Sequence, residues 1–327
     1  MPRRLTNDLL LLLVLAQIVT GLVGWAFPID RVLPVYALHR ALGVAVLLVI
    51  LRKQTIARAS LARRLARWPW DASIIWGLGA AAALLGSVAI GLAWTLNLVS
   101  FDALWGYSPL NVHVGLGIAA LPFVGWHMRR RWRLNALGQP VLARRTLLRL
   151  GAIGLGTLVG WRLLAPASRV TGSKHAGSLS GNAYPVTIWL LDQVPELDRD
   201  TWRLYVGGQV ALGYDQLISM LPERQLQAVL DCTSGWWSEQ VWSGVSLREL
   251  LAKLGLSPTA RSVTVTSVTG HGFTFPIQDL DEALLVTHVG GEPLTPGHGF
   301  PVRLAVPGRR GYQWVKWVER VSVTGDR

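Results

Sequence analysis

The only cysteine in this 327-residue chain, Cys232, lies in the stretch Gln227–Trp242, which reads QAVLDCTSGWWSEQVW. An apolar run typical of a buried strand precedes it, and a Ser-Gly turn followed by Trp236 and Trp237 comes after it. A lone thiol is often only a small buried hydrophobe. A thiolate is also a suitable ligand for a soft metal. The residues around Cys232 leave both interpretations open.

Three histidines lie within apolar stretches, where ionisable side chains are rare and often functional: His39, His113 and His127. His39 and His113 are each followed, four positions later, by a glycine (Gly43 and Gly117) that would let a flat macrocycle approach the helix backbone. Two neutral imidazoles from facing helices are the usual axial pair of a b-type haem. The pattern therefore predicts that His39 and His113 bind haem iron. Hydrogen bonding between helices is the alternative.

His127 follows His113 by fourteen positions, which corresponds to about 21 Å along a helix. That spacing resembles the two-haem helices of membrane cytochromes b. The matching position on the helix that carries His39 is Lys53, and no other apolar stretch offers a histidine. We therefore expect one haem, and interpret His127 as an interfacial residue that contacts quinone or lipid headgroups.

The chain divides near Pro166 into two parts, which must position these residues. Residues 1–166 carry 18 Lys/Arg and four acids, whereas residues 167–327 are close to neutral, so the first part holds the whole net charge of +13. Basic residues alternating with apolar stretches favour a membrane lipid surface over nucleic acid as the partner. Five predicted spans are each about long enough to cross roughly 30 Å of hydrocarbon: Leu5–Phe27, Val35–Leu51, Ile74–Leu98, Ser108–Met128 and Thr146–Ala165.

Basic residues gather before the first span and in the second and fourth loops, whereas the other loops hold few charges. The positive-inside rule therefore predicts a multi-pass protein of the cell membrane, with a cytoplasmic N-terminus and an extracytoplasmic C-terminal domain. The segment Val141–Leu155, VLARRTLLRLGAIGL, also resembles a twin-arginine export signal. The ordinary positive end of a span is the alternative. We assign residues 1–143 to a cytochrome b-like membrane domain and residues 144–166 to a fifth membrane helix.

We interpret residues 167–183 as a flexible linker and residues 184–327 as a separate α+β domain. The runs TWRLYVGG and SVTVTSVTG alternate like strands. The run SLRELLAKLGL has leucines at helical spacing after Ser246, a predicted N-cap. The predicted fold is a membrane α-helical bundle followed by an α+β domain.

From Tyr184 onward, the order of motifs strongly resembles the molybdopterin-binding domain of the sulfite oxidase superfamily. The motifs are Cys-x-x-Gly-Trp, Trp-x-Gly-Val before a Leu-rich helix, Gly-x-Pro-x-Arg, and Lys-Trp. The nearest pattern is the bacterial branch of periplasmic methionine-sulfoxide reductase catalytic subunits. The resemblance implies a molybdenum-molybdopterin cofactor and an oxidoreductase.

The resemblance also implies roles for single residues. Cys232 matches the cysteine whose thiolate binds molybdenum. Arg303 matches an arginine that holds the phosphate of the pterin, and Lys316 a lysine of the same pocket. His298 stands where the family has a cofactor-contacting asparagine. The remaining matched positions also contact the cofactor in the family: Ser267, Trp314 and Val315.

One departure bears on the substrate. The Arg-Asn-His stretch of animal and plant sulfite oxidases is absent, and TIWLLDQVP stands in its place, which disfavours sulfite. His271 and Arg309 are predicted polar partners of a substrate oxygen. We therefore expect a molybdenum oxidoreductase that takes electrons from the quinone pool through a b-type haem and reduces an S- or N-oxide, such as a small-molecule or protein sulfoxide.

Two alternatives remain open from the sequence. One is a sulfite-oxidase-like enzyme that delivers electrons to quinone. The other is a membrane receptor or scaffold whose outer domain has lost its metal. The presence of Cys232, Arg303 and Lys316 argues against that loss.

Overall fold

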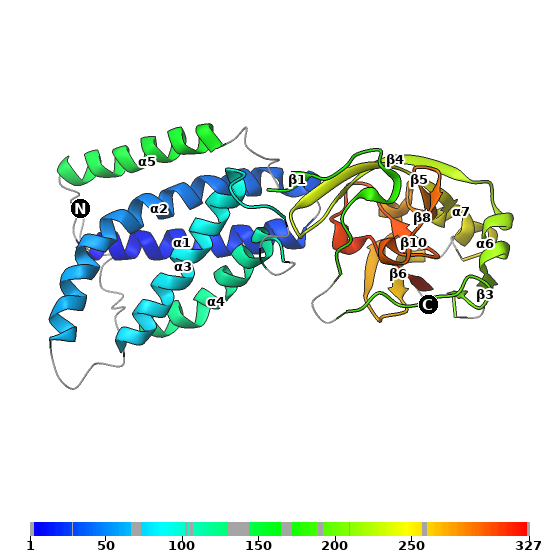
Figure 1. Cartoon of the computed structure of the whole chain (residues 1–327), viewed down its shortest axis with the longest axis horizontal. Coiled ribbons are helices and arrows are strands. Elements are labelled where there is room, and N and C mark those ends of the chain that lie inside the picture. Colours follow the sequence, from blue (N-terminus) through cyan, green and yellow to red (C-terminus); the bar gives the residue numbers. More distant parts are fainter. Residues whose placement is uncertain are drawn as a thin grey trace. The chain divides into compact units, whose positions relative to one another are not determined.

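The computed structural model describes residues 3–27, 29–66, 73–101, 104, 107–129, 144–164, 172–188, 192–208, 210–256 and 260–325. The chain divides into two compact units, Met1–Gly172 and Ser173–Arg327. Each unit has its own architecture, helical in the first and mixed in the second (Figure 1).

The first unit is a bundle of long helices. They are α1 (Arg3–Ala26), α2 (Ile29–Leu65), α3 (Ser73–Thr95), α4 (Pro109–Arg129) and α5 (Arg144–Leu164). Helix α1 packs on α2, and α3 packs on α4 (Figure 1). Within the described residues, α1 to α4 are long and apolar enough to cross a membrane, which agrees with four of the five predicted spans. Helix α2 continues to Leu65, well beyond the predicted end at Leu51.

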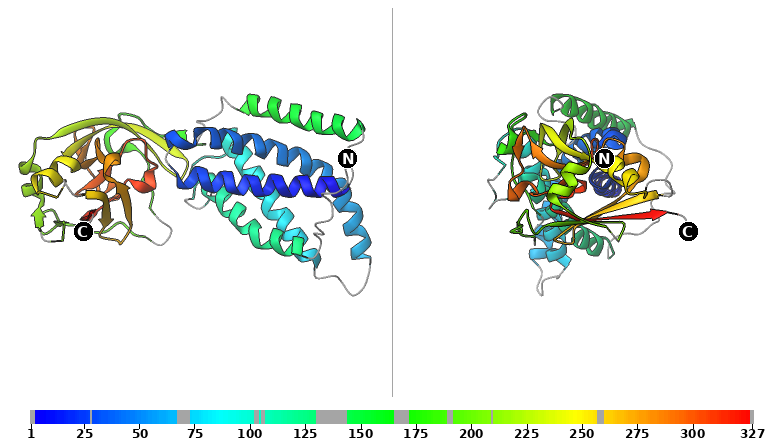
Figure 2. Two further views of the ribbon diagram at one scale, coloured as in Figure 1. Left: turned by 180° about the vertical axis from the view of Figure 1, so that it is seen from behind. Right: turned by 90° about the vertical axis from the view of Figure 1, so that its right-hand side faces the viewer.

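Helix α5 forms where the fifth span is predicted, but its composition differs from that of α1 to α4. Arg145, Arg149 and Arg162 interrupt its apolar run, and it is not among the candidate membrane spans of the described residues. Helix α5 lies along α2 in opposite views (Figures 1 and 2). Gly156 and Gly160 permit this approach, because a Cβ atom on either would lie 3.1 or 2.8 Å from an α2 side chain.

The second unit contains two sheets. The six-stranded sheet has the order β1-β5-β8-β10, with β4 paired to β5 and β9 paired to β8. Its strands are β1 (Lys174–His175), β4 (Arg224–Asp231), β5 (Trp236–Ser246), β8 (Leu284–Val289), β9 (Glu292–Pro293) and β10 (Arg303–Ala305). The five-stranded sheet has the order β3-β2-β11-β6-β7. Its strands are β2 (Arg203–Val206), β3 (Val210–Gly213), β6 (Ala260–Ser267), β7 (Gly272–Pro276) and β11 (Val318–Gly325).

The core of the second unit draws apolar side chains from both sheets and from α6 (Tyr214–Met220) and α7 (Leu247–Lys253). Leu247, Leu250 and Leu251 of α7 are completely buried, as their helical spacing predicts. The hydroxyl of Ser246 accepts a hydrogen bond from the Glu249 amide at 3.3 Å, which confirms the predicted N-cap. The predicted α+β domain is therefore present.

The described part of the predicted linker contributes structure to the second unit. Ser173 is buried, and β1 pairs in parallel with β5. The amides of Lys174 and Ala176 donate to the carbonyls of Gly235 and Trp237 at 2.8 and 2.9 Å. Composition rich in Ser and Gly suggests flexibility, but these backbone hydrogen bonds order the segment because their partners come from β5 and the turn before it.

Candidate functional site

Cys232 lies in the tight turn between β4 and β5. Its amide donates to the carbonyl of Trp236 at 2.8 Å, and the amide of Gly235 donates to the Cys232 carbonyl at 3.0 Å. Gly235 has φ 96°, a conformation that glycine adopts without steric cost. The Cys-Thr-Ser-Gly sequence thus forms a closed turn that holds the thiol, which is 8% exposed, at the end of the sheet.

Two hydrogen-bonding groups lie next to the sulfur of Cys232. The Thr187 hydroxyl lies 3.2 Å from Sγ, and the amide of Ser234 donates to Sγ at 3.5 Å. The Ser234 amide donates to the sulfur, and the Thr187 hydroxyl is able to donate to it. This environment suits a thiolate that binds a metal better than an inert apolar thiol.

Arg303 places a positive charge in the interior of the same unit. The side chain is 1% exposed, and its Nη1 donates to the Tyr184 hydroxyl and the His298 carbonyl, both at 3.1 Å. The guanidinium also faces the rings of Trp242 and Trp314 at 5.1 and 5.8 Å. Its Nε has no hydrogen-bond partner among the described residues. Burying a charge without a counterion is costly, so this arrangement favours an anionic ligand.

Lys316 lies next to Arg303. Its Nζ donates to the carbonyls of Thr187 and Gly297 at 2.9 and 2.6 Å. Burial, and secondarily the charge of Arg303, lowers the pKa of Lys316 to about 7. Gly299 brings the two basic residues together, because a Cβ atom there would lie 2.9 Å from Arg303 and 3.3 Å from Lys316. An anion bound by both side chains would offset their mutual repulsion.

His298 supports Arg303 through its backbone carbonyl, which accepts the hydrogen bond from Nη1. Burial lowers its pKa to about 4, so the ring is neutral at pH 7. Its Nε2 donates to the Tyr184 carbonyl at 2.9 Å, which leaves Nδ1 to accept from the Thr295 hydroxyl at 2.7 Å. Both ring nitrogens are therefore used within the protein. The cofactor contact of His298 stays a prediction.

Trp314 and Val315 are both buried beside Arg303 on the segment that leads to Lys316. The Val315 carbonyl accepts from the Leu304 amide at 2.7 Å, so it belongs to the scaffold. The indole N–H groups of Trp314 and Trp236 have no partner among the described residues and remain able to donate. Ser267 is buried at the end of β6, where its hydroxyl bonds to Thr269 at 3.2 Å.

The two residues predicted to face the substrate have protein partners. His271 Nε2 donates to the Tyr312 carbonyl at 2.8 Å. Arg309 forms an ion pair with Asp279, and both side chains are largely buried. An arginine held by an acid is less suited to bind a substrate oxygen than a free one. The substrate roles of His271 and Arg309 stay predictions.

A buried ion pair next to the thiol was not predicted from the sequence. Asp231, which precedes Cys232, lies 2.7 Å from Arg310, and the two side chains are 0% and 3% exposed. Asp231 also accepts a hydrogen bond from Ser173. Gly311 lies against the same turn, since a Cβ atom there would be 3.0 Å from the Cys232 Cα. The partners are far apart in the sequence, so only the acid beside the cysteine could have drawn attention to this pair.

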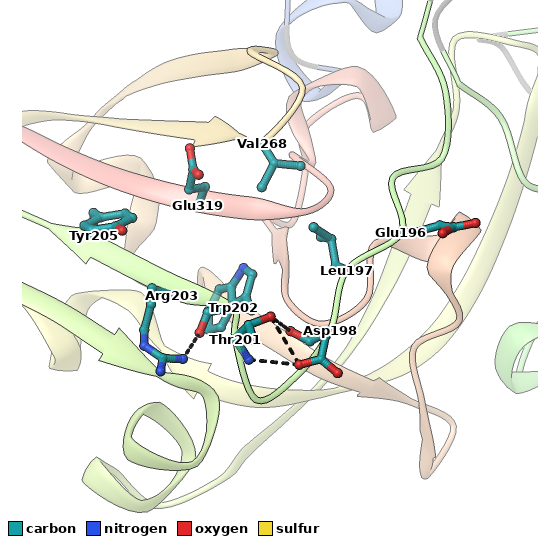
Figure 3. A pocket seen from close by; sticks show the side chains of 9 residues that line it. All are labelled: Glu196, Leu197, Asp198, Thr201, Trp202, Arg203, Tyr205, Val268 and Glu319. Atoms are coloured by element: carbon teal, nitrogen blue, oxygen red, sulfur yellow. Dashed lines mark hydrogen bonds between the residues drawn. The ribbon is translucent and has the colours of Figure 1, made fainter.

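A shallow pocket on the second unit involves different residues (Figure 3). It is lined by Glu196, Leu197, Asp198, Thr201, Trp202, Arg203, Tyr205, Val268 and Glu319. Asp198 accepts hydrogen bonds from the amide and hydroxyl of Thr201, as the dashed lines in Figure 3 show. This pocket contains none of the predicted site residues. Its three acids make it unsuitable for an anionic cofactor.

In the first unit, the structure brings His39 of α2 and His113 of α4 together. Their ring centroids are 6.1 Å apart and the ring planes are perpendicular. His113 Nδ1 lies 2.8 Å from the Ser87 carbonyl on α3, and His39 Nδ1 lies 3.0 Å from the Thr20 hydroxyl on α1. Each ring is thus oriented through Nδ1 by a helix other than its own.

Two glycines that were not singled out from the sequence lie beside these rings. A Cβ atom on Gly21 or Gly91 would lie 3.1 or 2.9 Å from His39 or His113, respectively. Gly43 instead approaches the Gln17 side chain, and Gly117 the hydroxyl of Ser87. Each ring is thus approached by a glycine of another helix, which sequence spacing within one helix could not reveal, and the role of Gly43 and Gly117 beside a macrocycle stays a prediction.

His127 belongs to a different part of the first unit. Its ring lies beside Gly77 of α3, where a Cβ atom would be 3.2 Å from Nδ1. In the same part of the unit, the ring of Trp76 packs at a tilt against Phe123 and Trp126, with centroid distances of 5.5 and 5.2 Å. Lys53, which occupies the matching position on α2, donates to Asn7. His127 therefore has no histidine facing it on α2.

Comparison with known proteins finds similarity in the second unit. Residues 191–327 match the family model described as the oxidoreductase molybdopterin binding domain. Mitochondrial sulfite oxidase from Rattus norvegicus is 33% identical over 169 residues, which cover 41% of this chain and 31% of the relative. A nitrate reductase [NADH] from Oryza sativa subsp. japonica is 30% identical over 172 residues, which cover 40% of this chain and 18% of the relative.

A solved structure also matches part of the chain. The sulfane dehydrogenase SoxCD from Paracoccus pantotrophus has 27% sequence identity and a TM-score of 0.37, and the match covers 40% of each chain. The chain thus spans less than a third of the length of the two curated relatives that it matches.

Proposed function

Because the C-terminal unit is a molybdopterin-binding oxidoreductase domain of the sulfite oxidase superfamily, we propose that the protein is a membrane-anchored molybdenum oxidoreductase. One observation carries this proposal. A buried thiol with two hydrogen-bonding neighbours lies in the same unit as the adjacent basic side chains of buried Arg303 and half-buried Lys316, whose direct contacts among the described residues include no acid. The four helices of the first unit that could cross a membrane support the anchor.

The residues present fit a molybdenum-molybdopterin cofactor. Cys232 would provide a thiolate ligand to the metal. Arg303, which is buried, and Lys316, which is half-buried, would hold the anionic phosphate, and the negative charge of the phosphate would favour the protonated form of Lys316. The free indole N–H groups of Trp236 and Trp314 would donate to polar atoms of the pterin. The bound metal supplies two-electron transfer, and these side chains bind and orient it.

We also propose one b-type haem between His39 and His113. Metal–imidazole nitrogen distances of about 2 Å place the ring centroids of two axial imidazoles roughly 6 Å apart. The 6.1 Å separation in this bundle is consistent with that value. The contacts of each Nδ1 with Thr20 or Ser87 point to Nε2 as the metal-binding atom, an arrangement common among histidine ligands. His39 Nε2 lies 3.2 Å from the Gln17 side-chain amide, a contact that iron binding would replace. The haem would pass electrons between quinone and the molybdenum domain.

The paired-histidine proposal predicts the optical spectrum of three variants. His39→Ala and His113→Ala should each remove the b-type absorbance, because each removes an axial ligand. His127→Ala should keep most of it, because its ring lies beside Gly77 of α3, whereas the rings of His39 and His113 face each other. Reduced-minus-oxidised spectra of the purified proteins test this. A complete loss of absorbance in His127→Ala would contradict the single-haem proposal.

For topology, we propose that the N-terminus is cytoplasmic and that the molybdenum domain is extracytoplasmic. The distribution of Lys and Arg among the loops supports this orientation. An extracytoplasmic site that receives electrons from the quinone pool would act on a substrate outside the cytoplasm. A metal-free receptor is disfavoured, because such a protein would have no need for Cys232, Arg303 and Lys316 in this arrangement.

We propose that electrons flow from quinol to an S- or N-oxide, such as a sulfoxide. The absence of the Arg-Asn-His stretch supports this direction. Oxidation of sulfite with reduction of quinone is the second candidate, favoured by the 33% identity to a sulfite oxidase. The relatives include both a sulfite oxidase and a nitrate reductase, so both directions occur among them.

A haem-oxidation assay distinguishes the two directions. The haem of the purified protein is first reduced by a quinol analogue. At least one member of a panel of sulfoxides and N-oxides should then reoxidise it. The haem absorbance reports the electron flow directly. In a second experiment that starts from oxidised haem, sulfite should not reduce the haem. Haem reduced by sulfite, together with no response to any oxide, would reverse the proposed direction.

A further inference from the structure

We propose that Thr187 is a positioning residue whose hydroxyl donates a hydrogen bond to the Cys232 sulfur and thereby tunes the bound molybdenum. This inference rests on the proposed function, since it assumes that Cys232 binds the metal. It adds a residue from a segment that the sequence motifs do not include.

Geometry ties Thr187 to the sulfur. Its Oγ1 lies 3.2 Å from Sγ, and within the described part of the chain the sulfur is the side-chain partner of this hydroxyl. The backbone carbonyl of Thr187 accepts from Lys316 Nζ at 2.9 Å. Lys316 in turn bonds to Gly297 at 2.6 Å, so the lysine anchors the Thr187 backbone to a second segment of the domain.

The direction of the hydrogen bond follows from the chemistry of a metal-bound thiolate. A deprotonated sulfur has no proton to donate, so the Thr187 hydroxyl must be the donor and Sγ the acceptor. The amide of Ser234 is a second donor at 3.5 Å, but it is fixed by the turn that contains Cys232 itself. Thr187 is the donor that comes from a distant segment of the chain. It can therefore be altered without changing the turn.

Hydrogen bonds to a ligating sulfur draw electron density away from the metal. They are among the factors that set the reduction potential of metal–thiolate centres. Loss of the Thr187 hydroxyl should make the sulfur a stronger electron donor and the metal harder to reduce. The β-branched side chain of threonine has restricted χ1 rotation, which helps keep the hydroxyl aimed at the sulfur.

Thr187→Val and Thr187→Ser in the full-length protein provide the test. Valine keeps the shape and branching but removes the hydroxyl, whereas serine retains the hydroxyl. Thr187→Val should bind molybdenum, shift the sulfur-to-metal charge-transfer absorption and move the metal midpoint potential to a more negative value. Loss of such a supporting contact commonly costs about 10- to 100-fold in activity or metal affinity. Thr187→Ser should restore wild-type values.

Thr264→Val is a matched control, because its hydroxyl bonds to Thr274 at an exposed position on β6. It should leave the spectrum, the potential and the metal content unchanged. A Thr187→Val protein with the wild-type absorption and midpoint potential would overturn this inference and leave the proposed function standing. Equal losses of molybdenum in the valine and serine variants would also overturn it, because serine keeps the donor. A wild-type protein that binds no molybdenum would reject the proposed function and this inference together.

Discussion

Cys232→Ser should reduce turnover to background while the chain still folds and inserts into the membrane. Serine keeps the size of the side chain and a hydrogen-bonding atom, so the turn between β4 and β5 should persist. A hydroxyl is a harder and much less acidic ligand than a thiol, so it replaces a thiolate poorly on a soft metal. Bound molybdenum should fall, or its optical spectrum should lose the sulfur-to-metal absorption.

Thr233→Ser is the control for this substitution, because it alters the neighbouring residue in the same turn by one methyl group. It should retain activity, metal content and spectrum. Since Cys232 is the only cysteine in the chain, no other thiol can take over as a ligand. Full turnover by the Cys232→Ser protein would reject the assignment of Cys232 as the metal ligand.

Arg310→Met should destabilise the C-terminal unit by about 3–5 kcal/mol, because it leaves the carboxylate of Asp231 buried without its counterion. Asp231 is completely buried, and the remaining hydrogen bond from Ser173 cannot replace a full charge. Denaturant unfolding of the C-terminal unit within the full-length protein, followed by tryptophan fluorescence, measures this change. The turn at Cys232 should lose order as well, since Asp231 precedes it directly.

Two further variants separate the loss of a buried pair from the loss of any ion pair. Arg248→Met removes the partner of Asp281 at an exposed site and should cost at most about 1 kcal/mol. The double substitution Asp231→Leu with Arg310→Met removes both charges and should recover much of the stability lost in Arg310→Met. Arg310→Met with wild-type stability would show that Asp231 is not held as a charged group.

Several features were predictable from the sequence because they depend on local patterns. The apolar runs of α1 to α4 predicted four helices that could cross a membrane, because a helix of about 20 apolar residues is long enough to span the hydrocarbon core of a bilayer. The Ser246 cap and the buried leucines of α7 follow from spacing within one turn or two. The ordered motifs around Cys232, Arg303 and Lys316 predicted the molybdopterin-binding domain, which the family comparison confirms.

Other features were decided by tertiary structure, because they join residues that are distant in the chain. No local pattern pairs Asp231 with Arg310, aims Thr187 at the Cys232 sulfur, or orders Ser173 in a segment of flexible composition. The same holds for the helical unit, where Thr20 and Ser87 orient the histidines of neighbouring helices. Side-chain types identify which groups can do chemistry. Packing determines which partners they meet, because burial makes each unpaired charge or donor costly and so selects the arrangement that satisfies them.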